Sequence, residues 1–204
     1  YLYASDTDVS IRTYIPRDKL TSLDEVGSIV IGGKYIVEII RKLPNTDISI
    51  EVIDGYKLII STDNTEFNLN GVNPNEYPNL DLDETKEPIV INTEVFKEMI
   101  NQTVFATSPS ETRPLLTGIN FRISGSELEV LATDSYRLAR KLVTIDHEVD
   151  NDVNIVIPGK NLVELIKMLD DDSTLELHLF SNKVLFKYKN MVFLSRLLSG
   201  TYPT

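Results

Sequence analysis

Few residues of this chain have the types and spacing that enzyme chemistry requires. Gly32-Gly33-Lys34 follows an apolar triplet, but no G-x-x-x-x-G-K-[ST] pattern surrounds it, so a nucleotide-binding P-loop is not predicted. The chain has no G-x-S-x-G sequence and no cysteine, and nothing supplies a nucleophile with a positioned base. We therefore predict no catalytic residues and no cofactor.

Two acidic groups and two histidines are the candidates for metal binding. Asp6-Thr-Asp8 and the three aspartates at 170–172 could bind a cation. A loop after a strand and a solvated turn after a helix explain these groups more simply. His147 and His178 each stand alone in the sequence, where a surface or strand-face position is the simpler interpretation. The sequence therefore predicts no metal site.

One segment has the composition of a binding site. Residues 131–139 read Leu-Ala-Thr-Asp-Ser-Tyr-Arg-Leu-Ala, which places small and polar residues at a strand end, followed by Tyr136, Arg137 and Leu138. Aromatic, arginine and aliphatic side chains together are typical of a protein-interaction hot spot. A plain connection between two strands explains the same residues, and the residue types alone leave both interpretations open.

The elements that position these residues belong to an internal repeat. The stretch 29–43 recurs 126 positions later as 155–169, and 9 of the 17 residues that begin at Ser28 and at Asn154 are identical. A weaker copy lies between them, at 89–100. Self-similarity at a fixed period indicates one supersecondary unit that is used several times.

Each copy of the repeat predicts a short strand followed by an amphipathic helix. A β-branched Ile-Val-Ile triplet opens the copy, and turn or helix-entry residues follow at 32–33, 92–93 and 158–159. Apolar residues then recur with the i, i+3, i+4, i+7 spacing of a helix that rests one face on a sheet. We expect three helices that begin near 33, 93 and 159.

Between the helices the chain reads as antiparallel strands. Three hairpins are expected, joined by Asp54-Gly55, Ser124-Gly125 and Ser181-Asn182. They connect 48–53 with 57–60, 119–123 with 128–132, and 175–180 with 184–188, and 191–198 adds a further strand. Helices on one face of antiparallel sheets predict an α+β fold.

The long period predicts two domains, at 1–86 and 87–204. Leu2-Tyr-Ala-Ser-Asp6 resembles Val130-Leu-Ala-Thr-Asp134, and Glu76-Tyr-Pro78 resembles Thr201-Tyr-Pro203. The acidic, proline-bounded stretch 79–88 has no hydrophobic periodicity and marks the boundary. Because the chain opens inside an expected strand and without Met, we interpret the first domain as lacking its first helix.

Composition and charge limit the function classes. The chain has 204 residues, 42% of them hydrophobic, and no cysteine, which is typical of a soluble intracellular protein of one large or two ordinary domains. No apolar run approaches the roughly 18 residues of a membrane span, so we predict a cytoplasmic protein without a membrane partner. A net charge of −11 argues against free binding to nucleic acid.

The basic residues are nevertheless placed periodically. The polar faces of the expected helices carry Lys34, Arg41 and Lys42 in one copy, and Lys160 and Lys167 in another. For any single helix a solvated face is the better interpretation. Equivalent placement in both copies favours a surface that DNA passes.

Several motifs together resemble the bacterial DNA polymerase III beta subunit family, the sliding clamps. Residues 132–139 are similar to the family motif A-T-D-[GS]-[HY]-R-L-A, and 76–80 resemble its [DE]-[FY]-P-N-L segment. Residues 113–118 and 199–203 fit the family's second domain in order and spacing. The resemblance covers essentially the whole chain and implies a clamp with three similar domains, of which the third is absent here.

The resemblance implies a non-catalytic processivity factor. Such a clamp closes as a head-to-tail homodimer around double-stranded DNA, and it tethers the replicative polymerase. The clamp loader and repair proteins bind it through short clamp-binding peptides. The alternative is a truncated chain that serves only as a protein-binding scaffold, because it cannot close a ring.

The resemblance also assigns roles to individual residues. The DNA-facing set is Lys34, Arg41, Lys42, Arg113, Lys160 and Lys167. Half of the peptide groove is formed by Leu116, Thr133, Ser135, Tyr136, Arg137, Leu138 and Pro203. The dimer edge is the strand at 64–70, with Phe67 and Leu69 as its apolar contacts.

Overall fold

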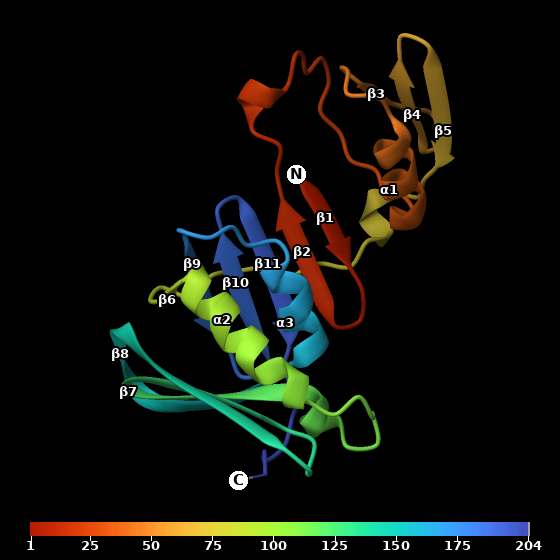
Figure 1. Cartoon of the computed structure of the whole chain (residues 1–204). Helices are drawn as coiled ribbons and strands as arrows, with labels where there is room; N and C mark the ends of the chain where they lie inside the picture. The colour runs from red at the N-terminus through yellow and green to blue at the C-terminus, as the bar shows by residue number, and fades with distance from the viewer. Residues whose placement is uncertain (204) are drawn as a thin grey trace. The chain divides into compact units, whose positions relative to one another are not determined.

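A computed structural model describes residues 1–203 of the chain (Figure 1). Three α-helices are present in these residues, α1 (Gly33–Lys42), α2 (Thr93–Thr103) and α3 (Gly159–Ile166). They begin at the positions that the repeat predicts. All strand pairs between named strands are antiparallel, so the predicted α+β class is confirmed.

The chain divides into two units, and each is described by itself. One unit is Pro16–Asp81, and the other combines Tyr1–Ile15 with the described chain from Leu82 onward. The predicted division at 86/87 assigns residues 1–15 differently and stays a prediction. Among residues 1–203 no helix is long and apolar enough to cross a membrane.

The unit Pro16–Asp81 contains a three-stranded sheet and α1. The strands β3 (Ser49–Ile53), β4 (Lys57–Thr62) and β5 (Thr65–Asn70) pair in chain order, so β5 is an edge strand. The predicted hairpin at Asp54-Gly55 is present, and its loop also includes Tyr56, because Gly55 and Tyr56 both adopt positive φ angles of 78° and 57°. Two short 3-10 helices complete the unit, η1 (Arg17–Lys19) and η2 (Pro74–Glu76).

The larger unit is built on a six-stranded sheet with the order β1-β2-β11-β10-β9-β6. Its strands, in chain order, are β1 (Leu2–Ser5), β2 (Val9–Thr13), β6 (Ile89–Asn92), β9 (Thr174–Leu179), β10 (Lys183–Tyr188) and β11 (Met191–Arg196). The hairpin predicted at Ser181-Asn182 joins β9 to β10. The strand β2 pairs with β11, so residues from the start of the chain extend a sheet made by its end.

A long two-stranded ribbon forms the second sheet of this unit. It consists of β7 (Gly118–Thr133) and β8 (Leu138–Pro158), which pair along nearly their whole length. The short helices η3 (Val104–Ala106) and η4 (Pro114–Thr117) connect α2 to this ribbon. In Figure 1 the ribbon extends beside α2 and α3.

The hairpin predicted at Ser124-Gly125 is wrong. The strand β7 continues through these residues, and the register shifts between Ile123 and Gly125 and again between Gly125 and Glu127. Gly125 takes a φ of 56°, because a bulge inside a strand needs the same left-handed conformation that a tight turn needs. The true hairpin loop lies at 134–137.

One hydrophobic core joins both sheets and both helices of the larger unit. Phe96 on α2 is fully buried, and its ring lies 5.7 Å from that of Phe186 on β10 and 6.5 Å from that of Phe121 on β7. The apolar positions of α3, Leu162, Leu165 and Ile166, are buried in the same cluster. The helices therefore hold the ribbon and the six-stranded sheet together through side chains predicted to face inward.

Two hairpins use the same turn, which confirms the sequence echo between residues 2–6 and 130–134. The Oδ1 atom of Asp6 accepts from the backbone N–H groups of Asp8 and Val9, both at 2.8 Å. The Oδ1 atom of Asp134 accepts from those of Tyr136 and Arg137, both at 3.0 Å. An aspartate that hydrogen-bonds to the amides two and three residues on fixes a turn in each case.

Candidate functional site

The loop at 134–137 is held by several side-chain hydrogen bonds. Besides the two bonds to Asp134 Oδ1, the hydroxyl of Thr133 accepts from the Ser135 N–H at 3.1 Å and donates to the Arg137 carbonyl at 2.6 Å. Ser135 has a φ of 80°, a conformation that non-glycine residues rarely adopt. Local hydrogen bonds thus fix a strained loop in one conformation.

The charge of Asp134 is stabilised by the same loop. The Tyr136 N–H holds the pKa of the Asp134 carboxyl below its ordinary value, and the N–H and positive charge of Arg137 act in the same direction against partial desolvation. Arg137 Nε lies 3.0 Å from Asp134 Oδ2. The carboxylate is therefore ionised at neutral pH and positions both the backbone and the arginine.

This loop and the first residue of β8 present apolar groups to solvent. The side chain of Tyr136 is 96% exposed and that of Leu138 is 58% exposed. Because hydrogen bonds already restrain the backbone of the loop, less backbone entropy is lost when a partner covers these groups. The loop therefore has the properties of a binding surface.

The structure brings some of the other predicted groove residues to this loop. The hydroxyl of Tyr202 accepts from the Thr133 N–H at 3.0 Å and donates to the Gly118 carbonyl at 3.3 Å, which ties the segment that contains Pro203 to the base of the loop. Burial raises the pKa of Tyr202, and the bond from Thr133 opposes this shift. Leu116, in contrast, is only 5% exposed, so a change there would disturb packing as well as any groove.

Arg113 lies with the groove residues. Its Nη1 atom donates to Ser135 Oγ at 3.0 Å, although the sequence assigned it to the DNA-facing set. Phe105 is a residue that sequence reasoning missed, since the guanidinium of Arg137 lies over its ring, 5.6 Å from the centroid. Phe105 belongs to η3, well before the 131–139 motif, and no local pattern connects the two.

The predicted DNA-facing residues on α1 and α3 differ in their surroundings. Lys34, Arg41 and Lys42 are exposed on α1, and within residues 1–203 none of them forms an ion pair. Lys160 Nζ lies 2.9 Å from Asp8 Oδ2, and this bond raises the pKa of Lys160. Lys167 lies 2.7 Å from Glu164 of the same helix. The cations of α1 are therefore the more available for phosphate.

The predicted dimer edge is a solvent-facing strand. In β5 the side chains of Phe67 and Leu69 are half-buried, while the residues between and beside them are exposed. The outer side of β5 has no partner strand among the described residues. Unpaired backbone groups of this kind are able to accept another strand.

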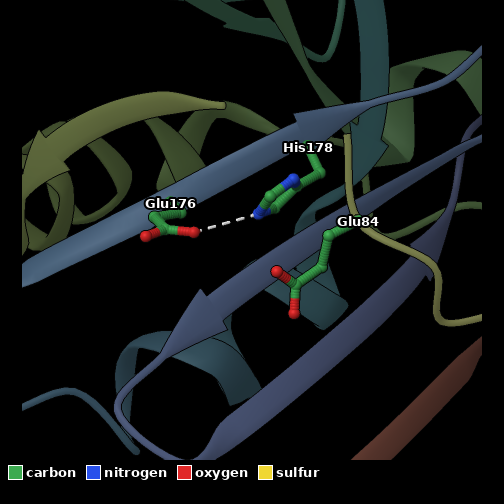
Figure 2. Close-up of side chains that lie close together, drawn as sticks. All are labelled: Glu84, Glu176 and His178. Atoms are coloured by element: carbon green, nitrogen blue, oxygen red, sulfur yellow. Dashed lines mark hydrogen bonds and ion pairs between the residues drawn. The ribbon is translucent and has the colours of Figure 1, made fainter. Parts of the chain in front are cut away.

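One cluster has the composition of a metal site. Glu84, Glu176 and His178 place one ligand atom each within 4.8 Å of one another, and Figure 2 shows His178 pointing between the two carboxylates. His178 Nδ1 accepts from the Thr85 N–H at 2.9 Å, so the proton resides on Nε2, which lies 3.1 Å from Glu176 Oε2. Glu84 bonds to Lys187 at 2.8 Å.

These bonds occupy both ring nitrogens of His178, and therefore no lone pair is available to a metal. The cluster instead fastens residues 84 and 85 onto β9 and β10. The pKa of Glu84 is lowered mainly by its hydrogen bond from Lys187.

The two acidic groups considered in the sequence are also used internally. Asp6 caps a turn, and the N–H of Val9 together with that of Asp8 lowers its pKa. Asp170 accepts from Lys189 Nζ at 2.7 Å, and Asp171 from Lys97 Nζ at 2.7 Å. These carboxylates stabilise a turn and form ion pairs within the protein.

The fold is that of a DNA sliding clamp. The crystal structure of the DNA polymerase sliding clamp from Bacillus subtilis matches with a TM-score of 0.93 and 43% identity, covering 99% of this chain and 55% of that one. The beta subunit of Streptococcus pyogenes matches with a TM-score of 0.89 and 31% identity, covering 99% of this chain and 54% of that one. The predicted repeat architecture is thereby confirmed.

The chain belongs to the DNA polymerase III beta subunit family. The sequence profile of its N-terminal domain matches residues 1–81, and that of its central domain matches residues 90–204. The beta sliding clamp of Bacillus subtilis is 46% identical over 98% of this chain and 54% of its own length. That of Staphylococcus aureus is 40% identical over 99% of this chain and 55% of its own length. The chain thus spans about half the length of these relatives.

Proposed function

We propose that the full-length protein is a non-catalytic processivity factor, a clamp that encircles double-stranded DNA and tethers the replicative polymerase. The proposal is supported by the family and by relatives that are named beta sliding clamps. Within it, the larger unit supplies a docking site for the clamp-binding peptides of polymerase, clamp loader and repair proteins. The observation that carries this role is the fixed loop that exposes Tyr136 and Leu138.

The peptide site consists of Thr133, Ser135, Tyr136, Arg137, Leu138 and Pro203, joined by Arg113. Leu138 and Pro203 provide apolar walls, and the small side chains of Thr133 and Ser135 let a peptide backbone approach. Tyr136 and Arg137 form the rim of the site. Leu116 supports this surface from within the core, since it is buried.

DNA is contacted weakly and without regard to sequence. Lys34, Arg41 and Lys42 face the duplex phosphates, while Lys160 and Lys167 share their charge with acidic neighbours. With a Debye length of about 8 Å at physiological salt, exposed cations act on phosphates only over short distances. Contacts of this kind hold a duplex without fixing it, which permits sliding.

The ring requires a second protomer. The open edge of β5, with Phe67 and Leu69 as apolar contacts, pairs with a strand of another protomer in a head-to-tail homodimer. A closed ring retains DNA by topology, so it does not need a strong electrostatic field. The net charge of −11 is compatible with that mode of retention.

Calorimetry of a polymerase clamp-binding peptide with the full-length protein tests the proposal. Leu138→Ala is expected to cost about 1–3 kcal/mol of peptide binding, the typical loss for an interface anchor. The matched control is Leu142→Ala, because Leu142 is 48% exposed on the same face of β8, about 13 Å further along the strand. Equal affinities of wild type and the folded Leu138→Ala variant would remove this loop from the site.

A further inference from the structure

Phe105 is an exposed aromatic residue in a segment that also contains fully buried residues. Its side chain is 56% exposed, whereas Thr103 and Ala106 are fully buried. The hydroxyl of Thr103 donates to the Met99 carbonyl at 2.7 Å, which anchors the end of α2 just before η3. The backbone around Phe105 is therefore fixed, while its ring contributes little to the core. A single exposed apolar residue is common and carries no conclusion by itself.

The ring of Phe105 has a specific partner in the loop at 134–137. The guanidinium carbon of Arg137 lies 5.6 Å from the ring centroid, within the range of a cation–π interaction. The Nε atom of the same guanidinium bonds to Asp134 Oδ2 at 3.0 Å. A carboxylate and a ring face thus hold one planar group from two directions, although the side chain of Arg137 is 54% exposed.

This arrangement leaves donors of Arg137 available. A guanidinium has five N–H donors, and the bond to Asp134 uses the one on Nε. An exposed arginine normally samples many rotamers, and fixing it on binding costs conformational entropy. An arginine already held over an aromatic ring has lost part of that freedom before the partner arrives.

We propose that Phe105 is a positioning residue of the peptide site, which holds the Arg137 guanidinium so that its free N–H groups meet oxygen acceptors of a bound peptide. The inference rests on the proposed function of the 133–138 surface. Phe105 acts through the face of its ring, so an aliphatic side chain of similar size does not replace it. The peptide site therefore includes a residue of η3 in addition to the ribbon and the C-terminal segment.

The experiment compares four full-length proteins by calorimetry with a polymerase clamp-binding peptide: Phe105→Leu, Phe105→Tyr, Arg137→Ala and the double variant Phe105→Leu/Arg137→Ala. Phe105→Leu is expected to lower affinity about three- to tenfold, in keeping with a cation–π contact. Phe105→Tyr keeps the ring and is expected to bind within about twofold of wild type. The double variant is expected to bind no more weakly than Arg137→Ala, because the two residues act together.

A matched control separates positioning from folding. Tyr3 is 52% exposed in β1, and its ring lies 6.2 Å from that of Tyr1, so Tyr3→Leu is expected to leave peptide affinity unchanged. Thermal unfolding of Phe105→Leu is expected to match wild type, since the ring is not in the core. An unchanged affinity for Phe105→Leu would overturn the inference, as would an additive loss in the double variant.

The Leu138→Ala variant in the same series distinguishes a failure of the proposed peptide site from a failure of the role of Phe105 within it. If Leu138→Ala binds weakly and Phe105→Leu binds normally, only the role of Phe105 is wrong. If wild type fails to bind the peptide, or Leu138→Ala has no effect, the proposed peptide site fails and the role of Phe105 fails with it.

Discussion

At the residue scale, single hydroxyl and carboxyl groups fix the loop at 134–137. Tyr202 and Asp134 are the clearest cases, since each bonds to backbone groups at the base of the loop or within it. Neither is an exposed apolar group that a partner would cover. Both therefore affect binding through the geometry of the loop, and their effects are separable by substitutions that change few atoms.

Tyr202→Phe removes one hydroxyl and keeps the ring in its buried position. The change deprives the Thr133 N–H and the Gly118 carbonyl of their partner, so we expect a loss of about 1–3 kcal/mol in the free energy of unfolding. Denaturant titration measures this loss, and hydrogen exchange is expected to show faster exchange at the Thr133 amide.

Tyr188→Phe provides the control for this prediction. The Tyr188 hydroxyl accepts from the Asp170 N–H and donates to the Asp170 carboxylate. Tyr188→Phe therefore also removes one hydroxyl with two hydrogen bonds, but at a site away from the loop. A similar loss of stability is expected without any change at Thr133. Faster exchange at Thr133 in both variants would contradict a local role for Tyr202.

The loop is expected to loosen in acid because of Asp134. Its folded pKa is lowered, first by the Tyr136 N–H, so its contribution is complete above the unfolded pKa of about 3.9. That contribution is lost as pH falls through the lower folded pKa. An NMR titration of the carboxyl group, with the Tyr136 and Arg137 amides as reporters, is expected to show a single transition below about pH 4.

Asp134→Asn keeps an oxygen acceptor for the two amides and removes the charge. The acid transition of the Tyr136 and Arg137 amides is expected to disappear in this variant. If the transition persisted unchanged, another carboxyl group would control the loop.

At the element scale, helix α2 is the central support of the larger unit. Phe96 contacts aromatic rings of both sheets and is fully buried. Phe96→Ala is expected to lower the free energy of unfolding by about 3–5 kcal/mol, because it leaves a cavity that both sheets surround. Chemical denaturation measures the effect.

The neighbouring residue offers a control on the same helix. Val95 is 36% exposed, so Val95→Ala is expected to change stability by less than about 1 kcal/mol. Equal losses for the two variants would show that α2 does not carry the core in the described way.

The sequence predicts helices better than it predicts connections. Helix-entry residues together with the apolar spacing place the starts of α1, α2 and α3, since a helix that covers a sheet must repeat its apolar residues every three or four positions. Ser124-Gly125 misleads because a bulge and a turn require the same glycine conformation, and only the partner strand distinguishes them. Contacts such as Thr85 with His178, or Phe105 with Arg137, join distant residues and have no local signature.

The candidate site residues also differ in whether the sequence alone locates them. The 132–139 motif is contiguous, so its similarity to the family locates Thr133 to Leu138 directly. The structure is needed to place Arg113 against Ser135 and to show that Leu116 is buried. The ion pair between Lys160 and Asp8 joins residues 152 positions apart, so the charge pattern of the sequence does not predict it either.

At the scale of the whole molecule, unequal pairing predicts unequal contributions of the cations to DNA binding. Lys34→Ala is expected to reduce the slope of log affinity against log salt by about 0.9, the value for one phosphate contact. Lys160→Ala is expected to reduce it less, because Asp8 already neutralises that ammonium group. Fluorescence anisotropy with a short duplex at several salt concentrations measures both slopes.

Lys86→Ala is the control for the loss of one positive charge, since Lys86 is an exposed residue of the acidic connection between the two regions that match family domains. Its slope is expected to equal that of wild type. If one of the helix substitutions changed the preference for a particular base sequence, direct base recognition would replace the sliding mechanism.

The pairing of β2 with β11 has a consequence for dissecting the chain. The region that matches the family's central domain begins at residue 90, yet the backbone partners of Val192–Ser195 in β11 are the residues Val9–Arg12. Expression of 90–204 alone would remove β2, the neighbour of β11. The unpaired backbone groups of β11 would then be exposed, together with Val192 and Phe193, which are otherwise buried. Such an edge recruits further copies, so the excised piece is expected to aggregate, and the unit that remains soluble when produced separately includes the first fifteen residues.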